Sequence, residues 1–141
     1  MVEAGAPVFL AVDLDDQSRH ALAARLTSAF DEMRIPGVVV RPENWHLTLR
    51  YFGVLPQSSL ELLMFHLSES WLGTPFRLQL DGLGAFPKPS LASVLWVGTA
   101  EGTEELVVLK QAIDEALEHI GWEPEDRPFE PHMTLSRIRP P

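Results

Sequence analysis

Two histidines of this chain stand in the same short pattern, His-apolar-Thr-Leu, which begins once at His46 and again at His132. Successive side chains of a β-strand point to opposite faces. We therefore expect His46 and Thr48 to share one face of a strand, and His132 and Thr134 to share one face of another. Two such strands facing one another would bring two imidazoles and two hydroxyls into one cleft. These groups are suited to acid–base chemistry on a phosphate.

Displacement at phosphorus needs two proton transfers, one from the attacking oxygen and one to the leaving oxygen. The two oxygens lie on opposite sides of phosphorus, nearly in line. A histidine can give or take a proton near neutral pH, because its ordinary pKa is about 6.5. Hydroxyl and guanidinium donors can stabilise the charge on the other phosphate oxygens. This chemistry needs no metal ion and no cofactor.

Further candidates follow from the same pattern. Strict alternation puts Arg50 on the face of His46, which makes it a candidate phosphate contact. Arg137 falls on the face opposite His132 unless a bulge or a strand end intervenes. Phe9 and Phe86 can stack on a nucleobase, with packing in the core as the alternative. A single His-x-Thr on a strand also arises by chance, and a duplication can keep the pattern without activity.

Apolar periodicity and turn residues predict the elements that must position these groups. Asp15 or Asp16 is expected to cap the first helix. A loop rich in glycine and proline is expected at 82–89. The expected strands cover 8–12, 38–40, 45–52, 76–80, 94–98 and 131–138, and the expected helices cover 16–34, the segment opened by Pro56 and Ser58, and 103–120.

The order strand, helix, His-x-Thr strand occurs twice, over about 8–52 and 94–138. This repeat predicts an α+β fold with two pseudo-symmetric lobes. Antiparallel-rich sheets would flank a central cleft, with the helices packed outside. We expect residues 1–141 to form a single domain, because no separate linker interrupts the repeat.

Composition excludes several classes of protein. The chain of 141 residues has no cysteine, which excludes disulfides, thiolate metal sites and a cysteine nucleophile. We find no signal peptide and no membrane-spanning stretch, so a cytoplasmic monomer without an obligate protein partner is expected. The net charge of −9 argues against broad binding to nucleic acid. A locally basic cleft would suit a small anionic group or a strand end.

Four segments, residues 41–49, 83–87, 94–98 and 127–137, give the chain its resemblance to a known family. It resembles the 2H phosphoesterase superfamily, and within it the bacterial and archaeal RNA 2′,3′-cyclic phosphodiesterases, also called 2′-5′ RNA ligases. The resemblance covers nearly the whole chain. The paired motifs with these flanking residues are specific, whereas either one alone would be a weak signal.

The resemblance implies hydrolysis of a terminal RNA 2′,3′-cyclic phosphate to a 2′-phosphate, without a cofactor. It implies that His46 is the proton donor, His132 the proton acceptor, and Thr48 and Thr134 donors to the phosphate. Arg137 matches the family's arginine after the second motif. RNA ends or cyclic-phosphate nucleotides would be the substrates, and 2′-5′ ligation is the reverse reaction.

Several alternatives stay open at this point. The residues themselves do not say which histidine is the acid. The same chemistry could act on small cyclic nucleotides or 2′-5′ oligonucleotides, and a non-catalytic RNA- or nucleotide-binding module could keep the cleft. Members of the family usually continue past the position of Pro141, so a natural short form and a shortened chain are both open.

Overall fold

The computed structural model describes residues 4–33, 37–88 and 92–138, and it shows an α+β fold with antiparallel strand pairing. The α+β class predicted from the sequence is confirmed. The elements are β1 (Gly5–Asp13), α1 (Asp16–Met33), β2 (Val38–Val39), the 3-10 turn η1 (Pro42–Asn44), β3 (His46–Pro56), α2 (Gln57–Glu69), β4 (Leu80–Phe86), β5 (Val94–Thr99), α3 (Thr103–Glu118) and β6 (Met133–Arg137). The predicted end of the first helix, at Arg34, lies outside the described residues.

The chain folds into two compact units, and each is built from three separate segments. Unit 1 draws on 1–11, 48–78 and 101–131, and unit 2 on 12–47, 79–100 and 132–141. Each unit thus contains parts of both copies of the strand–helix–strand repeat.

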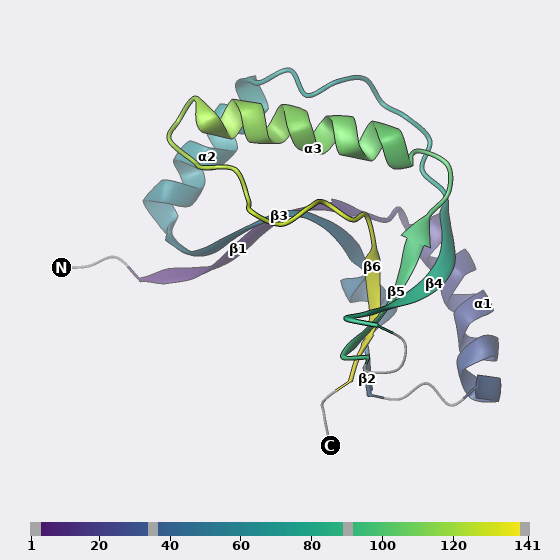
Figure 1. Cartoon of the computed structure of the whole chain (residues 1–141). Coiled ribbons are helices and arrows are strands. Elements are labelled where there is room, and N and C mark those ends of the chain that lie inside the picture. Colours follow the sequence, from purple (N-terminus) through teal and green to yellow (C-terminus); the bar gives the residue numbers. More distant parts are fainter. Residues whose placement is uncertain (1–3, 34–36, 89–91, 139–141) are drawn as a thin grey trace. The chain divides into compact units, whose positions relative to one another are not determined.

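Unit 1 consists of most of β1, most of β3, and the helices α2 and α3, which pack on each other. Figure 1 shows both helices on the same side of the β1–β3 ribbon. Leu106, Ile113 and Leu117 of α3 are almost completely buried. His66 of α2 joins the two helices, because its Nε2 lies 2.7 Å from the carbonyl oxygen of Ala116 and donates to it.

Unit 2 is organised around β6. This strand pairs antiparallel with β5 along one edge, and with β2 and the start of β3 along the other. β4 pairs antiparallel with β5 (Figure 1). Met133 and Leu135 of β6 are fully buried. The two histidines of the repeated motif, His46 and His132, both belong to this unit.

The structure corrects the sequence prediction for the segment before β5. The strand expected at 76–80 is absent from the described chain except for Leu80, and most of the loop expected at 82–89 is strand β4. The strand at 76–80 was predicted from period-two alternation. The loop at 82–89 was predicted from its glycines. Gly82 has a positive φ of 79° at a register shift between Leu80 and Leu83. The glycines therefore accommodate an irregular strand and do not end it.

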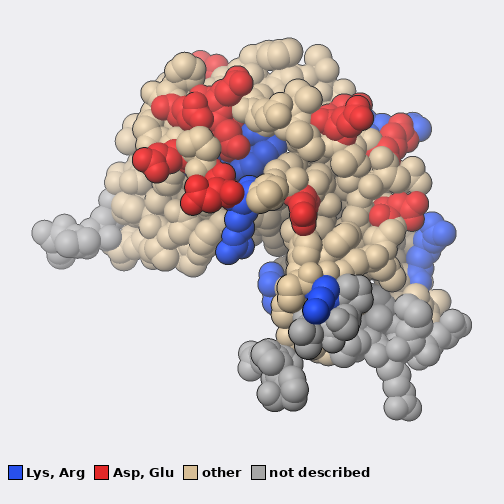
Figure 2. Space-filling model, in the orientation of Figure 1, with Lys and Arg blue, Asp and Glu red and all other residues tan. Residues whose placement is uncertain are grey.

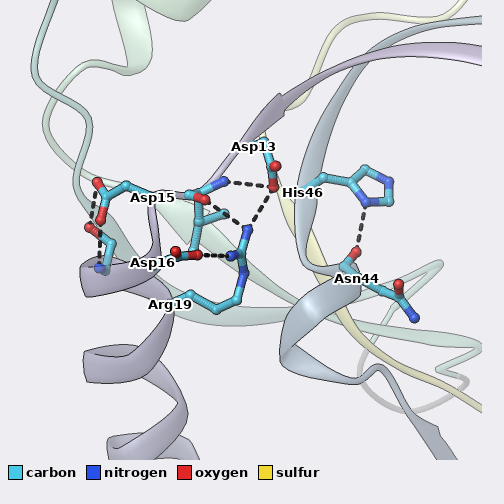
Figure 3. A network of polar contacts seen from close by, with 8 residues as sticks. Asp13, Asp15, Asp16, Arg19, Asn44 and His46 are labelled. Carbon is cyan, nitrogen blue, oxygen red and sulfur yellow. Dashed lines mark hydrogen bonds and ion pairs between the residues drawn. The ribbon is translucent and has the colours of Figure 1, made fainter.

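Asp15 caps α1, as one of the two sequence alternatives predicted. Its carboxylate accepts hydrogen bonds from the backbone N–H of Ser18 at 2.7 Å and from the Ser18 hydroxyl at 3.0 Å. These bonds lower the pKa of Asp15 below its usual value, the backbone bond contributing most. Figure 3 shows a second network at this turn, in which Arg19 bridges Asp13 and Asp16, each at 2.9 Å.

Acidic side chains dominate the charged surface, as the net charge of −9 requires. In Figure 2 the visible face carries several groups of acidic side chains and fewer basic ones. Among the helices of the described ranges, none combines the length and apolar character that crossing a membrane requires.

Candidate active site

The register between β3 and β6 places the two motifs side by side. Leu47 lies opposite Met133 in an antiparallel pair, and both side chains are buried. The flanking residues point to the other face, so His46 comes opposite Thr134. His132 is then the diagonal neighbour of His46. Diagonal neighbours of an antiparallel pair typically lie about 7–8 Å apart. Both histidines are half-buried, so substrate can reach them.

His46 is held in a defined tautomer. It follows the η1 turn and the buried Trp45. Its Nδ1 lies 2.7 Å from the carbonyl oxygen of Asn44 (Figure 3). A carbonyl can only accept a hydrogen bond, so Nδ1 carries the proton that is donated. Nε2 is therefore the ring nitrogen that faces away from this hydrogen bond and carries the lone pair of the neutral imidazole.

His132 lies against two aromatic rings of unit 2. The ring centroid of Phe86, the last residue of β4, is 5.0 Å from that of His132, and the two planes are nearly perpendicular at 88°. The indole of Trp96 in β5 lies 6.0 Å away at 58°. The sequence analysis did not place Trp96 in the site. The sequence does carry a signal that could have found Trp96. This residue lies in the first strand of the second repeat, which ends shortly before the helix of that repeat.

A bulge in β6 decides where Arg137 points. Trp96 pairs with Thr134 and the preceding Leu95 with Ser136, so β6 has one extra residue, Leu135. The Leu135 carbonyl accepts a hydrogen bond from the Val40 N–H at 2.8 Å. Directly opposite residues of paired strands share a face.

The consequence for Arg137 follows from its own partner. Arg137 pairs with Val94, which lies two residues from Trp96 and therefore on the same face of β5. Arg137 thus shares the face of Thr134, and its side chain is exposed. The bulge that strict alternation required for this arginine is present in the strand.

Two other candidates belong to unit 1. Thr48 is exposed in β3, two residues after His46. Phe9 of β1 has an exposed fraction of 47%. Both are accessible to a ligand. Within the described ranges, no group of three or more His, Cys, Asp or Glu side chains is placed to hold a metal ion.

Arg50, the phosphate contact suggested by strand alternation, is buried in the structure. It is only 4% exposed. Its Nη1 lies 2.9 Å from Asp114 Oδ1, and its Nη2 donates to the Glu123 carbonyl. Lys110, itself buried, also contacts Asp114 at 3.1 Å. The guanidinium is thus committed to a charge network inside unit 1, which argues against its role as a phosphate contact.

Comparisons with known proteins show the family of this chain. A family model described as the 2′-5′ RNA ligase superfamily matches residues 15–140. An RNA 2′,3′-cyclic phosphodiesterase of Aeropyrum pernix is 36% identical over 116 residues, which are 82% of this chain and 65% of that protein. The chain thus spans just under two thirds of that relative's length.

Two further matches cover more of their own chains. The RNA 2′,3′-cyclic phosphodiesterase of Archaeoglobus fulgidus is 34% identical over 133 residues, 94% of this chain and 72% of that protein. The crystal structure of Escherichia coli LigT complexed with 3′-AMP matches with a TM-score of 0.76 and 26% identity, over 94% of this chain and 73% of that one.

Proposed function

Because the chain belongs to the 2′-5′ RNA ligase superfamily, we propose that it hydrolyses terminal 2′,3′-cyclic phosphates of RNA to 2′-phosphates. The observation that carries this proposal is the diagonal placement of His46 and His132 on one face of unit 2, on either side of the Leu47–Met133 pair. The printed names of the relatives, RNA 2′,3′-cyclic phosphodiesterase, support the same substrate class.

The proposed reaction begins with a neutral His132 and a protonated His46. His132 takes a proton from water as the water oxygen forms a bond to phosphorus. The bond from phosphorus to the 3′-oxygen breaks, and Nε2 of His46 gives its proton to that oxygen. The products are a 2′-phosphate and a free 3′-hydroxyl, and proton exchange with solvent restores both imidazoles.

The fixed tautomer of His46 favours its role as the acid. Since Nδ1 keeps its proton in the bond to Asn44, the proton of the imidazolium is released from Nε2 alone. The direction of proton donation is thus defined by the backbone. We propose that Thr48, Thr134 and Arg137 donate to the non-bridging phosphate oxygens.

Ligation and its reversal belong to the same proposal. If the 5′-hydroxyl of an RNA end attacks the cyclic phosphate in place of water, the 3′-oxygen leaves in the same way and a 2′-5′ phosphodiester forms. By microscopic reversibility the same two histidines, with exchanged roles, catalyse cleavage of that diester back to the cyclic phosphate. Water competes with the hydroxyl of an RNA end for the cyclic phosphate. Hydrolysis is therefore the expected net reaction in dilute solution.

The test is turnover of a short RNA that ends in a 2′,3′-cyclic phosphate, with EDTA present, followed by phosphorus NMR. We expect a 2′-phosphate product. His46→Ala and His132→Ala should each abolish it while the fold is kept. His20→Ala is the matched control, because His20 is an exposed histidine of α1 in the same unit. Binding without turnover by the wild type would instead support a non-catalytic module.

A further inference from the structure

Phe86 and Trp96 form an aromatic pair that the proposed reaction does not use. Their ring centroids lie 5.1 Å apart with an angle of 36° between the planes. Both residues are half-buried, and both lie against the imidazole of His132 at 5.0 and 6.0 Å. The pair therefore forms one side of the environment of the proposed base.

Gly84 explains why the indole can lie where it does. Gly84 is directly opposite Trp96 in the β4–β5 ladder. A Cβ atom at this position would lie 2.2 Å from Cζ2 and 2.3 Å from Cη2 of the indole, which is far inside van der Waals contact. Gly84 is required for space, as is typical where another group approaches a strand closely.

His132 lies one residue before the start of β6, whose first paired residue is Met133. An edge contact from Phe86 and a tilted contact from Trp96 approach the imidazole at different angles, and together they restrict its rotation.

We infer that Phe86 and Trp96 are positioning residues that fix the imidazole of His132 for attack by water, with Gly84 providing the space for the indole. The inference rests on the proposed function. The ring plane sets the direction of the nitrogen lone pair, and only an aligned lone pair can take the proton in the transition state. A loosened ring should thus affect the chemical step more than substrate binding.

The experiment compares Phe86→Leu, Phe86→Tyr and Gly84→Ala with the wild-type chain on the cyclic-phosphate substrate. We expect Phe86→Leu to lower kcat on the order of 10- to 100-fold, with KM within about twofold of the wild-type value because binding groups are untouched. Phe86→Tyr should restore most of kcat, since it keeps the ring. Gly84→Ala should resemble Phe86→Leu because it displaces the indole.

The control is Phe52→Leu in unit 1. Phe52 and Trp122 form an aromatic pair of the same size, with centroids 5.0 Å apart and planes at 74°. Its loss should lower the melting temperature without changing kcat at a temperature where the chain is folded. An equal loss of kcat in this control would overturn the inference, because stability alone would then explain the effect.

Three outcomes distinguish this inference from the proposed function. A wild-type chain without turnover overturns both. Turnover in the wild type, abolished by His132→Ala but kept within about twofold in Phe86→Leu, overturns the positioning role alone. A rise in KM with unchanged kcat also overturns it, since Phe86 would then bind the substrate directly.

Discussion

Replacement of Arg50 by methionine tests whether this residue binds the substrate or stabilises the fold. If Arg50 contacted phosphate, Arg50→Met would chiefly weaken substrate binding. The structure predicts a loss of stability, because Arg50 is 4% exposed and its Nη1 lies 2.9 Å from Asp114. Methionine keeps the apolar length of the side chain, so the change removes mainly the charge and its hydrogen bonds.

The size of the stability loss depends on the Asp114 carboxylate, which stays partly buried when the Arg50 guanidinium is removed. Removing one partner of a buried ion pair costs about 3–5 kcal/mol, because the other charge stays buried. Here Lys110 still contacts Asp114 at 3.1 Å, and Asp114 keeps 22% of its side chain exposed. We therefore expect the low end, about 3 kcal/mol. For a chain of this size that corresponds to about 10 °C in melting temperature.

Urea unfolding followed by tryptophan fluorescence measures the loss. Arg41→Met is the matched control, since Arg41 is 81% exposed and lies 3.9 Å from Glu43. Exposed pairs of this kind contribute little, so no measurable change is expected. Under conditions where Arg50→Met is folded, its KM should stay within about threefold of the wild-type value. A KM raised tenfold or more, with unfolding unchanged, would refute this reasoning and restore Arg50 as a substrate contact.

Two further predictions concern the turn before α1 and the first histidine. The lowered pKa of Asp15 means that its contribution to stability is present above the usual aspartate pKa of 3.8 and is lost as pH falls through the folded-state value. The stability difference between wild type and Asp15→Asn should therefore shrink on acidification, and a pH-independent difference in urea midpoint would contradict it. Long-range proton–nitrogen NMR should find neutral His46 protonated at Nδ1, and a majority of the Nε2–H tautomer would show that the bond to Asn44 does not form in solution.

Strand alternation correctly predicted which side chains of the two motifs are buried where the strands are regular. Met133 and Leu47 are buried on one face, as the pattern required. Alternation fails at Arg50, because Leu49 and Arg50 are both buried in succession. The cause lies far along the chain, in Asp114 and the Glu123 carbonyl. No local pattern contains that information.

Arg137 and β4 show two other limits. The sequence showed that Arg137 needed an irregular strand to reach the face of Thr134, but only the pairing of β5 with β6 locates the extra residue at Leu135. In β4, Gly84 was read as part of a loop because glycine usually weakens strands. Glycine is required at this position because the indole of Trp96 on the neighbouring strand occupies the space of a Cβ atom. This is a tertiary contact, which the local sequence does not show.

The position of β6 in unit 2 has a consequence for biosynthesis. β6 follows β2, β3 and β5 in the chain, yet it is the strand with which all three pair. On a ribosome, which adds about 5–20 residues each second, those earlier strands emerge with their shared partner still untranslated. Unit 2 therefore cannot complete its hydrogen bonding before Arg137 has left the exit tunnel. Nascent chains stalled ahead of Met133 should be cut readily by protease within β5, and protection there would disprove this order of events.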